Sequence, residues 1–408
     1  MIITRLYVEN LYCFKSTELD LSYTRFPLNE RIDSEYLEDR PKFYFKKVCI
    51  LSGANATGKT SLGKILLGIQ LFITRVVIDN NYLVIGNHDV PARFTVDFVI
   101  PSTNNLYRVD CSLRRYENVT YVTSLNFGHV YIRQNDSCRV ATKRLTDLFS
   151  RGIVKTDHYS LTDSNRYVSS DAIGIVEAQN VFKDIFGVNN FGWHYVFSEN
   201  DESSSSVHDI KVDILKKILM TFDPSVTNVV QLIAENDKNK KKRTIEGFSV
   251  RFKNGEAVVI GTTGKPDDPN RLSRGTFESI KVARLLSRII SDYDNDKHND
   301  YGITSTYFLD EKMAFAHTEL EQLILTILIS KLSRYSQLFY TTHNVDVLDL
   351  NLPAHSYTFI KKESDNAIFI EALSLAKKND RSLRSLVQNN CFGTKPDDEL
   401  LFEILSGE

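Results

Sequence analysis

Residues 53–60 read GANATGKT, which matches the phosphate-loop pattern G-x-x-x-x-G-K-[ST] in full. The apolar run 46–51 before it predicts a short strand, and residues 61–77 after it predict a helix. The pattern needs this strand–loop–helix setting, because the loop N–H groups and the helix N-terminus together bind an anion. We therefore predict a triphosphate site in which ATP is held by Gly53, Ala54, Asn55, Ala56, Thr57, Gly58, Lys59, Thr60 and Ser61.

Two side chains of this loop have expected roles of their own. Lys59 is expected to reach the β- and γ-phosphates, and the hydroxyl of Thr60 is expected to bind Mg²⁺. ATP and Mg²⁺ are thus the predicted cofactors. The alternative is a glycine-containing turn that matches the pattern by chance, and the flanking strand and helix patterns argue against it.

Three later segments narrow the class of protein. Residues 272–275 read LSRG and precede a helical pattern, residues 306–311 read TYFLDE, and residues 339–344 read FYTTHN. The last two are apolar strands that end in polar residues suited to phosphate chemistry. The order of phosphate loop, L-S-x-G, strand with Asp-Glu and strand with His is that of the ABC-type ATPases. Each segment alone has an ordinary structural interpretation, but their joint order favours the functional one.

The polar residues at these strand ends have distinct chemical roles in such a site. Asp310 would bind Mg²⁺ beside Thr60, and Glu311 would orient or deprotonate the attacking water. His343 would donate a hydrogen bond to the γ-phosphate. We therefore predict catalytic roles for Glu311, His343 and Lys59, and metal ligation by Thr60 and Asp310.

The L-S-x-G segment has a separate role. Ser273 and the N–H of Gly275 lie at a predicted helix N-terminus, where an anion is favoured. In ABC proteins such a segment completes the site of a second protomer, so that ATP lies between two subunits. We therefore expect both residues to bind the nucleotide of a neighbouring copy.

Composition limits the remaining possibilities. The chain has 408 residues, a net charge of −2 and 42% apolar residues, values of an ordinary globular protein without the global positive charge of a nucleic-acid binder. A basic run at 238–243 predicts a solvated turn, with a phosphate-backbone contact as the alternative.

Five scattered cysteines predict a reducing compartment, and no apolar run reaches the ~18 residues that span a bilayer. We expect a cytoplasmic protein with no membrane partner.

The expected fold class is α/β, an ABC-type P-loop ATPase with a mixed central sheet, an antiparallel β subdomain and a helical insertion. Residues 1–139 would form an N-terminal lobe with the phosphate loop and a β meander. Residues 140–224 would form a mostly helical insertion, with helices at 169–186 and 207–222. Residues 225–408 would form a C-terminal lobe with the L-S-x-G, Asp-Glu and His segments.

The same motifs resemble those of a known group of proteins. The chain is similar to the RecF/SMC-like branch of the ABC ATPases and, within it, to the overcoming-lysogenization-defect (OLD) type found in bacterial phage-defence loci. The likeness covers about residues 1–110 and 210–396. Beside the motifs above, it is carried by ITRLYVENLYCFKSTELDLS (3–22), DILKKILMTFDPSVTNVV (213–230), LSRGTFESIKVARLL (272–286) and FGTKP (392–396).

The resemblance implies an enzyme that hydrolyses ATP as a homodimer or higher oligomer and gates a separate effector protein, a nuclease or a toxin. The sequence contains no heptad run for a long coiled coil and no C-terminal nuclease signature, so the effector is expected on another polypeptide. After Glu311 the chain departs from the family pattern, because Lys312 and Met313 follow and leave the inter-subunit aspartate role unassigned. Gln134 is a candidate for the glutamine loop.

Two other functions stay open at this point. A RecF-like dimer that clamps DNA in repair or recombination would need a basic face, and the net charge of −2 is a mild argument against it. Because this function stays open, nucleic acid is kept as a candidate partner. A scaffold that binds ATP without hydrolysing it is disfavoured by the presence of Glu311.

Overall fold

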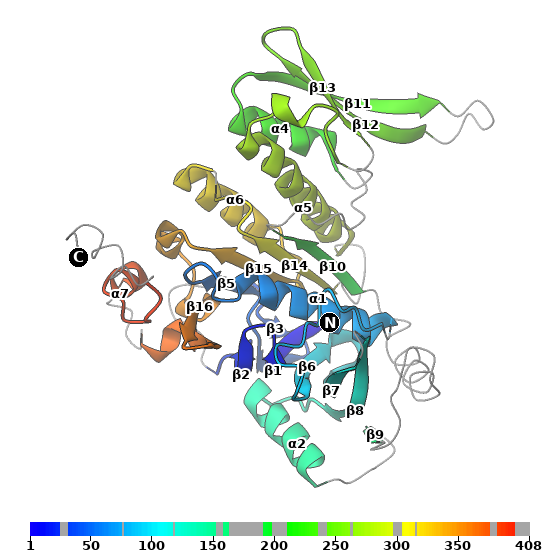
Figure 1. The fold of residues 1–408 in the computed structure, drawn as a ribbon, viewed down its shortest axis with the longest axis vertical. Coiled ribbons are helices and arrows are strands. Elements are labelled where there is room, and N and C mark those ends of the chain that lie inside the picture. Colours follow the sequence, from blue (N-terminus) through cyan, green and yellow to red (C-terminus); the bar gives the residue numbers. More distant parts are fainter. Residues whose placement is uncertain are drawn as a thin grey trace.

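A six-stranded sheet at the centre of the molecule brings together strands from distant parts of the chain (Figure 1). Five of its strands run parallel in the order β10, β14, β15, β5 and β16, and β17 pairs with β16 in the antiparallel direction. Every residue of β5, β14 and β15 is buried, as expected for parallel strands that are covered on both faces. The bounds are Val48–Ser52 (β5), Phe191–Val196 (β10), Thr304–Asp310 (β14), Gln337–Thr342 (β15), Tyr357–Glu363 (β16) and Asn366–Glu371 (β17).

The protein is a mixed α/β structure with several sheets, consistent with the predicted fold class at that level. No helix among the described residues is long and apolar enough to cross a membrane. The computed structural model describes residues 1–24, 32–75, 77–116, 119–151, 158–162, 191–197, 210–235, 243–261, 264–296, 304–314, 316–375 and 382–395.

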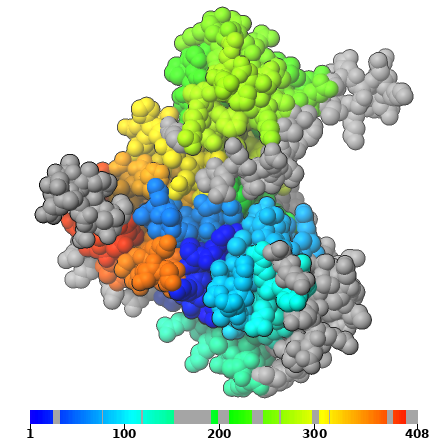
Figure 2. All heavy atoms as spheres, in the orientation of Figure 1, coloured from blue at the N-terminus to red at the C-terminus, as the bar shows by residue number. Residues whose placement is uncertain are grey.

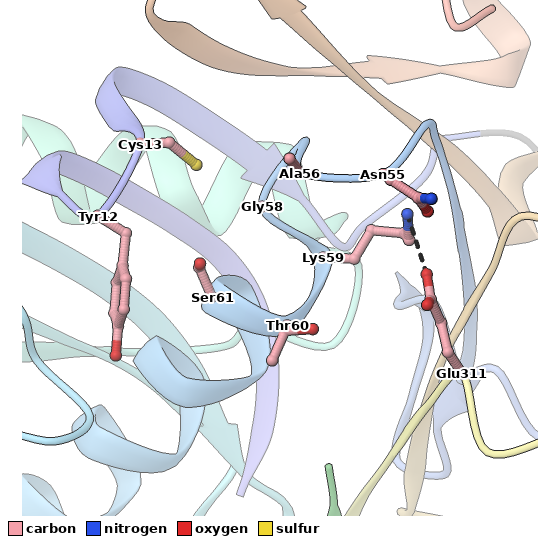
Figure 3. Close-up of a pocket in the computed structure, with 9 residues that line it drawn as sticks. All are labelled: Tyr12, Cys13, Asn55, Ala56, Gly58, Lys59, Thr60, Ser61 and Glu311. Carbon is pink, nitrogen blue, oxygen red and sulfur yellow. Dashed lines mark ion pairs between the residues drawn. The ribbon is translucent and has the colours of Figure 1, made fainter. Parts of the chain in front are cut away.

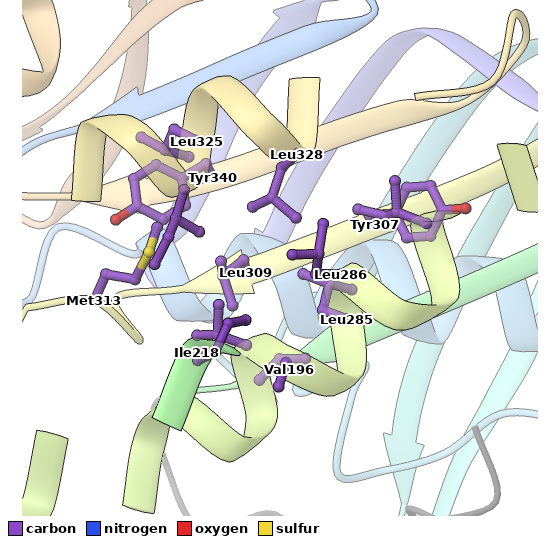
Figure 4. Close-up of a cluster of buried hydrophobic side chains, with 14 of the residues drawn as sticks. Val196, Ile218, Leu285, Leu286, Tyr307, Leu309, Met313, Leu325, Leu328 and Tyr340 are labelled. Atoms are coloured by element: carbon purple, nitrogen blue, oxygen red, sulfur yellow. The ribbon is translucent and has the colours of Figure 1, made fainter. Parts of the chain in front are cut away.

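Helices cover both faces of the central sheet. On one face, α1 (Lys59–Arg75) shares a hydrophobic core with Phe308 of β14. On the other face, α5 (Arg274–Asp296) and α6 (Thr318–Ser330) share a second core with Tyr307 of the same strand (Figure 4). Neighbouring residues of β14 enter opposite cores because side chains alternate between the two faces of a strand.

A second six-stranded sheet is antiparallel throughout and packs in the same core as α1. Its strand order is β2-β1-β6-β7-β8-β9. The tight turn between β1 and β2 contacts the phosphate loop, because the Sγ of Cys13 lies 3.8 Å from the carbonyl oxygen of Thr57. The bounds are Ile2–Leu11 (β1), Phe14–Asp20 (β2), Ala92–Ile100 (β6), Asn105–Tyr116 (β7), Val119–Tyr131 (β8) and His158–Thr162 (β9).

A smaller lobe stands out from the rest of the molecule (Figure 2). It contains α4 (Val212–Phe222) and a three-stranded antiparallel sheet of β11 (Val226–Glu235), β12 (Arg243–Phe252) and β13 (Ala257–Gly261). Apolar residues of α4, β11 and α5 belong to one core, so α5 connects this lobe to the central sheet (Figure 1).

The remaining described elements are short or peripheral. They are the hairpin β3 (Tyr36–Leu37) and β4 (Arg40–Tyr44), the helices α2 (Cys138–Ser150) and α7 (Leu383–Gln388), and the 3₁₀ turns η1 (Pro101–Thr103), η3 (Pro269–Arg271), η4 (Val345–Asp349), η5 (Ala354–Ser356) and η6 (Ala372–Ser374). Ser137 caps the N-terminus of α2 by accepting a hydrogen bond from the N–H of Val140.

The segment 140–224 differs from the expected helical insertion, since it contains two strands, β9 of the antiparallel sheet and β10 of the central sheet. Trp193 and Tyr195 of β10 pack against the core that contains α1, whereas His194 stacks on Tyr307 of the opposite face. This alternation is strand-like, and the dense aromatic composition obscured it in the sequence. The expected helix at 169–186 and most of the basic run at 238–243 lie outside the described residues. The division into three segments stays a prediction.

Candidate active site

The loop between β5 and α1 has a backbone that only certain residues allow. A side chain at Gly53 would place its Cβ 2.5 Å from the carbonyl oxygen of Ile360 on β16. Gly58 has a φ of +105°, and a Cβ there would lie 2.7 Å from the Sγ of Cys13. The hydroxyl of Thr57 donates to the carbonyl of Ala54 at 2.9 Å and closes the loop on itself. The two glycines of the pattern are therefore required by close approach and by a left-handed backbone.

Lys59 lies at the centre of the site. Its ammonium donates to the carbonyl oxygens of Gly53 and Ala54, both at 2.8 Å, and lies 3.0 Å from Oε1 of Glu311 (Figure 3). The Lys59 side chain is only 4% exposed, so its charge is held under the loop. This arrangement joins the phosphate loop to the end of β14, although the two are remote in the sequence.

Thr60 and Asp310 form the second contact between these segments. The hydroxyl of Thr60 donates to Oδ2 of Asp310 at 2.7 Å, and the hydroxyl of Thr341 donates to Oδ1 at 2.7 Å. Asp310 is fully buried. Its contacts follow from the parallel register, in which Asp310 of β14 pairs with Thr341 of β15, so that the carboxyl ends of both strands meet the N-terminus of α1.

The pair of Thr60 and Asp310 fits Mg²⁺. A hydroxyl oxygen and a carboxylate oxygen already lie 2.7 Å apart, and Mg²⁺ is commonly bound by one or two such protein groups together with substrate phosphates and water. A larger protein cage is not needed, and the described residues contain no group of three or more His, Cys, Asp or Glu that would form one.

An Asp310→Asn substitution is expected to raise the Mg²⁺ concentration needed for half-maximal ATP hydrolysis by about tenfold or more, because a neutral amide replaces the charged ligand. The measurement is ATPase activity against free Mg²⁺ at saturating ATP. Asp89→Asn is the matched control, since Asp89 is an exposed loop residue. A Mg²⁺ dependence that stays at the wild-type value would remove Asp310 from the metal site.

Glu311 and His343 lie side by side at the ends of adjacent strands. Glu311 adopts a φ of +49°, and its N–H lies 3.1 Å from the hydroxyl and 3.3 Å from the carbonyl oxygen of Thr341. Its carboxylate is 23% exposed, and Nδ1 of His343 lies 3.9 Å from Oε1. The imidazole of His343 is 52% exposed and thus accessible to a ligand. The left-handed turn directs Glu311 across the strand end toward Lys59, where a water beside a phosphate would be within its reach.

The residue after Glu311 connects this turn to α5. Lys312 is buried, and its ammonium lies 2.7 Å from Oε2 of Glu278 on α5. Nearby, burial and the charge of Lys312 lower the pKa of Lys281 to about 8. The helix that begins after Ser273 is thus tied by an ion pair to the turn that carries Glu311.

Ser273 and Gly275 do not line the cavity around Lys59. Ser273 precedes α5, accepts a hydrogen bond from the N–H of Thr276 at 3.1 Å and is exposed. Thr276 in turn donates to Asp223, which follows α4 in the smaller lobe, at 3.4 Å. Gln134 is exposed in the turn between β8 and α2 and does not line the cavity either. Direct contacts therefore join the loop, Asp310, Glu311 and His343 within one chain, whereas Ser273 and Gly275 are not among the residues that line the cavity.

A cavity of about 430 Å³ opens over the phosphate loop. Two of its lining residues, Tyr12 and Cys13, were not predicted and come from the turn between β1 and β2 (Figure 3). Tyr12 adopts a φ of +51° and donates its hydroxyl to the carbonyl of Asn81 at 2.9 Å. Burial raises the pKa of the Cys13 thiol, so this group stays protonated and is a poor nucleophile. The other lining residues are Asn55, Ala56, Gly58, Lys59, Thr60, Ser61 and Glu311.

The solved structures that are similar to this chain include two proteins of low sequence identity, an SMC head and RecF. One is an SMC head bound to the C-winged-helix domain of ScpA, with 11% sequence identity, a TM-score of 0.42, and coverage of 91% of this chain and 98% of that chain. The other is the recombination mediator protein RecF of the RecFOR pathway, with 9% identity, a TM-score of 0.39, and coverage of 90% and 98%. No protein-family model and no curated protein matches the chain. The residues of the site therefore carry the functional assignment.

Proposed function

We propose that this protein is an ABC-type ATPase that hydrolyses Mg²⁺-ATP and works as a nucleotide-bridged dimer or higher oligomer. The observation that supports it best is the double contact between the phosphate loop and the end of β14. The hydroxyl of Thr60 lies 2.7 Å from Asp310, and the ammonium of Lys59 lies 3.0 Å from Glu311. A glycine-rich turn of purely structural origin has no need for two adjacent carboxylates at this position.

Each side chain has one task in the proposed reaction. The loop N–H groups and Lys59 bind the β- and γ-phosphates, and Thr60 and Asp310 hold Mg²⁺, which neutralises charge on the phosphates. Glu311 orients the attacking water and accepts its proton. His343, at 3.9 Å from Glu311, donates a hydrogen bond to the γ-phosphate and thereby reports its presence.

The dimer is proposed because Ser273 and Gly275 are not among the residues that line the cavity of their own chain. Ser273 precedes the 23-residue helix α5, and Gly275 lies in its first turn, where the free N–H groups favour an anion. In a symmetric pair, each copy would present this segment to the nucleotide bound by the other copy. ATP binding would then stabilise the closed dimer, and hydrolysis would release it.

Mixing two inactive variants tests the shared site. Lys59→Ala disables phosphate binding by the loop of its own chain. Ser273→Arg disables the L-S-x-G segment that the chain offers to its partner. Each variant alone is therefore expected to be inactive. In a random mixture, half of the dimers contain both variants, and each of these has one intact site of two. The mixture should therefore recover roughly a quarter of the wild-type rate. The measurement is ATPase activity after joint refolding or co-expression.

A control keeps this test specific. A chain that carries both substitutions, mixed with Lys59→Ala, forms no intact site and should give no recovery. Ser273→Arg alone should still bind ATP, because its own loop is unchanged. Full activity of Ser273→Arg alone would show that the segment takes no part in the site.

For the output of the ATPase, we propose the gating of a separate effector, a nuclease or toxin, in phage defence. The support is the resemblance of the sequence motifs to OLD-type ATPases. A RecF-like DNA-binding ATPase is the alternative, and it predicts a different behaviour. Its affinity for duplex DNA would depend on ATP and fall steeply with salt, because each neutralised phosphate releases counterions. Absence of such binding, together with ATP-dependent association of a co-expressed effector, would favour the first function.

A further inference from the structure

Glu321 is a buried carboxylate that the reaction scheme above does not use. It lies in the first turn of α6 and is only 2% exposed. Its Oε1 accepts hydrogen bonds from the hydroxyls of Tyr340, at 2.5 Å, and Thr342, at 3.1 Å. Its Oε2 accepts from the side-chain amide of Asn344 at 2.7 Å. Three donors from one short segment thus converge on a single carboxylate.

The donors flank His343 on both sides. Tyr340 and Thr342 are alternate residues of β15 and face α6, and Thr342 immediately precedes His343. Asn344 immediately follows it. The N–H of Asn344 also donates to the hydroxyl of Thr342 at 2.9 Å, which closes the turn that displays the histidine. The Glu321 carboxylate therefore fixes the residues on either side of His343 and leaves the imidazole itself half exposed.

The side-chain amide of Asn344 also caps the element that follows it. The Oδ1 of Asn344 accepts the N–H of Asp346 at 3.0 Å and caps the 3₁₀ turn η4. With Oδ1 committed to this cap, only the amide nitrogen of Asn344 is available for Glu321. The Nδ2 of Asn344 donates to Glu321 and, at 3.5 Å, to the hydroxyl of Thr318, so the contacts on its two ends fix the amide orientation and Glu321 must present an acceptor to it.

The electrostatics agree with a positioning role. Among the described residues, no ion pair joins Glu321 to a cation, so its charge is compensated by these three hydrogen bonds. Burial is the main cause that raises the pKa of Tyr340 well above its ordinary value, and the adjacent Glu321 is the second cause. Tyr340 therefore keeps its proton and remains a donor to the carboxylate.

We propose that Glu321 is a positioning residue for His343. By anchoring Thr342 and Asn344, it holds the imidazole at the end of β15, next to Glu311, in the geometry that the γ-phosphate requires. This inference rests on the proposed ATPase function. A group that is displaced by about 1 Å loses much of its catalytic effect, so the anchor is expected to act on the chemical step rather than on ATP binding.

The first test is a Glu321→Gln substitution, which keeps size but turns one acceptor oxygen into a donor NH₂ that faces the NH₂ of Asn344 or a hydroxyl. The kcat for ATP hydrolysis should fall by about tenfold, and KM should change by less than about twofold. Glu319→Gln is the matched control, since Glu319 lies in the same helical turn and is exposed. Its kcat should equal that of the wild type.

A polarity swap separates positioning from general damage. Asn344→Asp alone places a carboxylate against Glu321 and should also lower kcat. In the Glu321→Gln/Asn344→Asp double variant, the glutamine NH₂ donates to one oxygen of the new aspartate, and the other oxygen can still cap Asp346. The double variant should therefore recover most of the kcat lost by either single variant.

The decisive test compares Glu321→Gln in the wild type and in a His343→Ala variant. If Glu321 acts through His343, then Glu321→Gln should lower kcat by less than about twofold when His343 is already alanine. A full tenfold loss in that background, or a wild-type kcat for Glu321→Gln alone, would overturn the inference. If Glu321→Gln does not fold, Asn344→Ser carries the test, because serine keeps a capping hydroxyl but has no amide to reach Glu321.

Failure of this inference can be told apart from failure of the proposed function. If Glu311→Gln and His343→Ala lower hydrolysis but Glu321→Gln does not, only the positioning role is lost. If the wild type does not hydrolyse ATP, or if Glu311→Gln is as active as the wild type, the proposed function fails and the positioning role fails with it.

Discussion

A Glu311→Gln variant is expected to hydrolyse ATP at no more than about a hundredth of the wild-type rate, because a positioned general base contributes roughly 10²–10⁴-fold. Glutamine is a close replacement here. It has the same length as glutamate, and the left-handed φ of +49° at this position costs both residues about the same. The loss would therefore report the missing carboxylate rather than a distorted turn.

The same variant should bind ATP at least as tightly as the wild type. Oε1 of Glu311 lies 3.0 Å from the ammonium of Lys59, so the carboxylate competes with a phosphate for that charge. A neutral amide removes this competition and also removes the repulsion between the carboxylate and the γ-phosphate. ATP-dependent assembly should accordingly persist or strengthen while turnover is lost.

Steady-state ATPase rates and the molecular mass in solution with and without ATP measure both effects. Glu18→Gln serves as the control, since Glu18 lies on β2 and its side chain is 44% exposed. Equal turnover in Glu311→Gln and wild type would remove Glu311 from the chemistry. In that case a scaffold that binds ATP without hydrolysing it would become the better interpretation.

The phosphate loop could be predicted from the sequence because its determinants are local. Gly53, Gly58 and Lys59 fall within a few residues of one another, and the flanking strand and helix have clear hydrophobic patterns. The proximity of Asp310 and His343 to the loop was predicted from the order of motifs. Its physical cause is the parallel register of β14, β15 and β5, which places the carboxyl ends of three strands at one edge.

Other parts of the site depend on tertiary contacts that no local pattern encodes. Tyr12 and Cys13 reach the cavity because the β1–β2 turn of one sheet packs against the loop of another. Glu321 falls in an amphipathic helix where a glutamate is ordinarily exposed, and its burial depends on donors supplied by β15. The placement of Ser273 next to a nucleotide requires a second copy, so that role stays a prediction.

A Lys59→Ala variant is expected to lose ATP binding, with the dissociation constant raised by roughly 100-fold. The estimate follows from a lost charge-assisted hydrogen bond of about 3 kcal/mol, at about 1.4 kcal/mol per factor of ten. Titration with a fluorescent ATP analogue in the presence of Mg²⁺ measures the affinity. Lys143→Ala is the control, because Lys143 is exposed on α2, a helix that does not contribute to the cavity.

Thermal unfolding gives an independent measure of the same loss. Saturating ATP should raise the Tm of the wild type, since a ligand that binds only the folded state stabilises it by RT ln(1 + [L]/Kd). The shift should be nearly absent in Lys59→Ala. Without ATP, the variant should unfold at a somewhat lower temperature, because the carbonyl groups of Gly53 and Ala54 and the carboxylate of Glu311 lose their shared donor. An unchanged ATP affinity, or a full Tm shift by ATP, would refute the role assigned to Lys59.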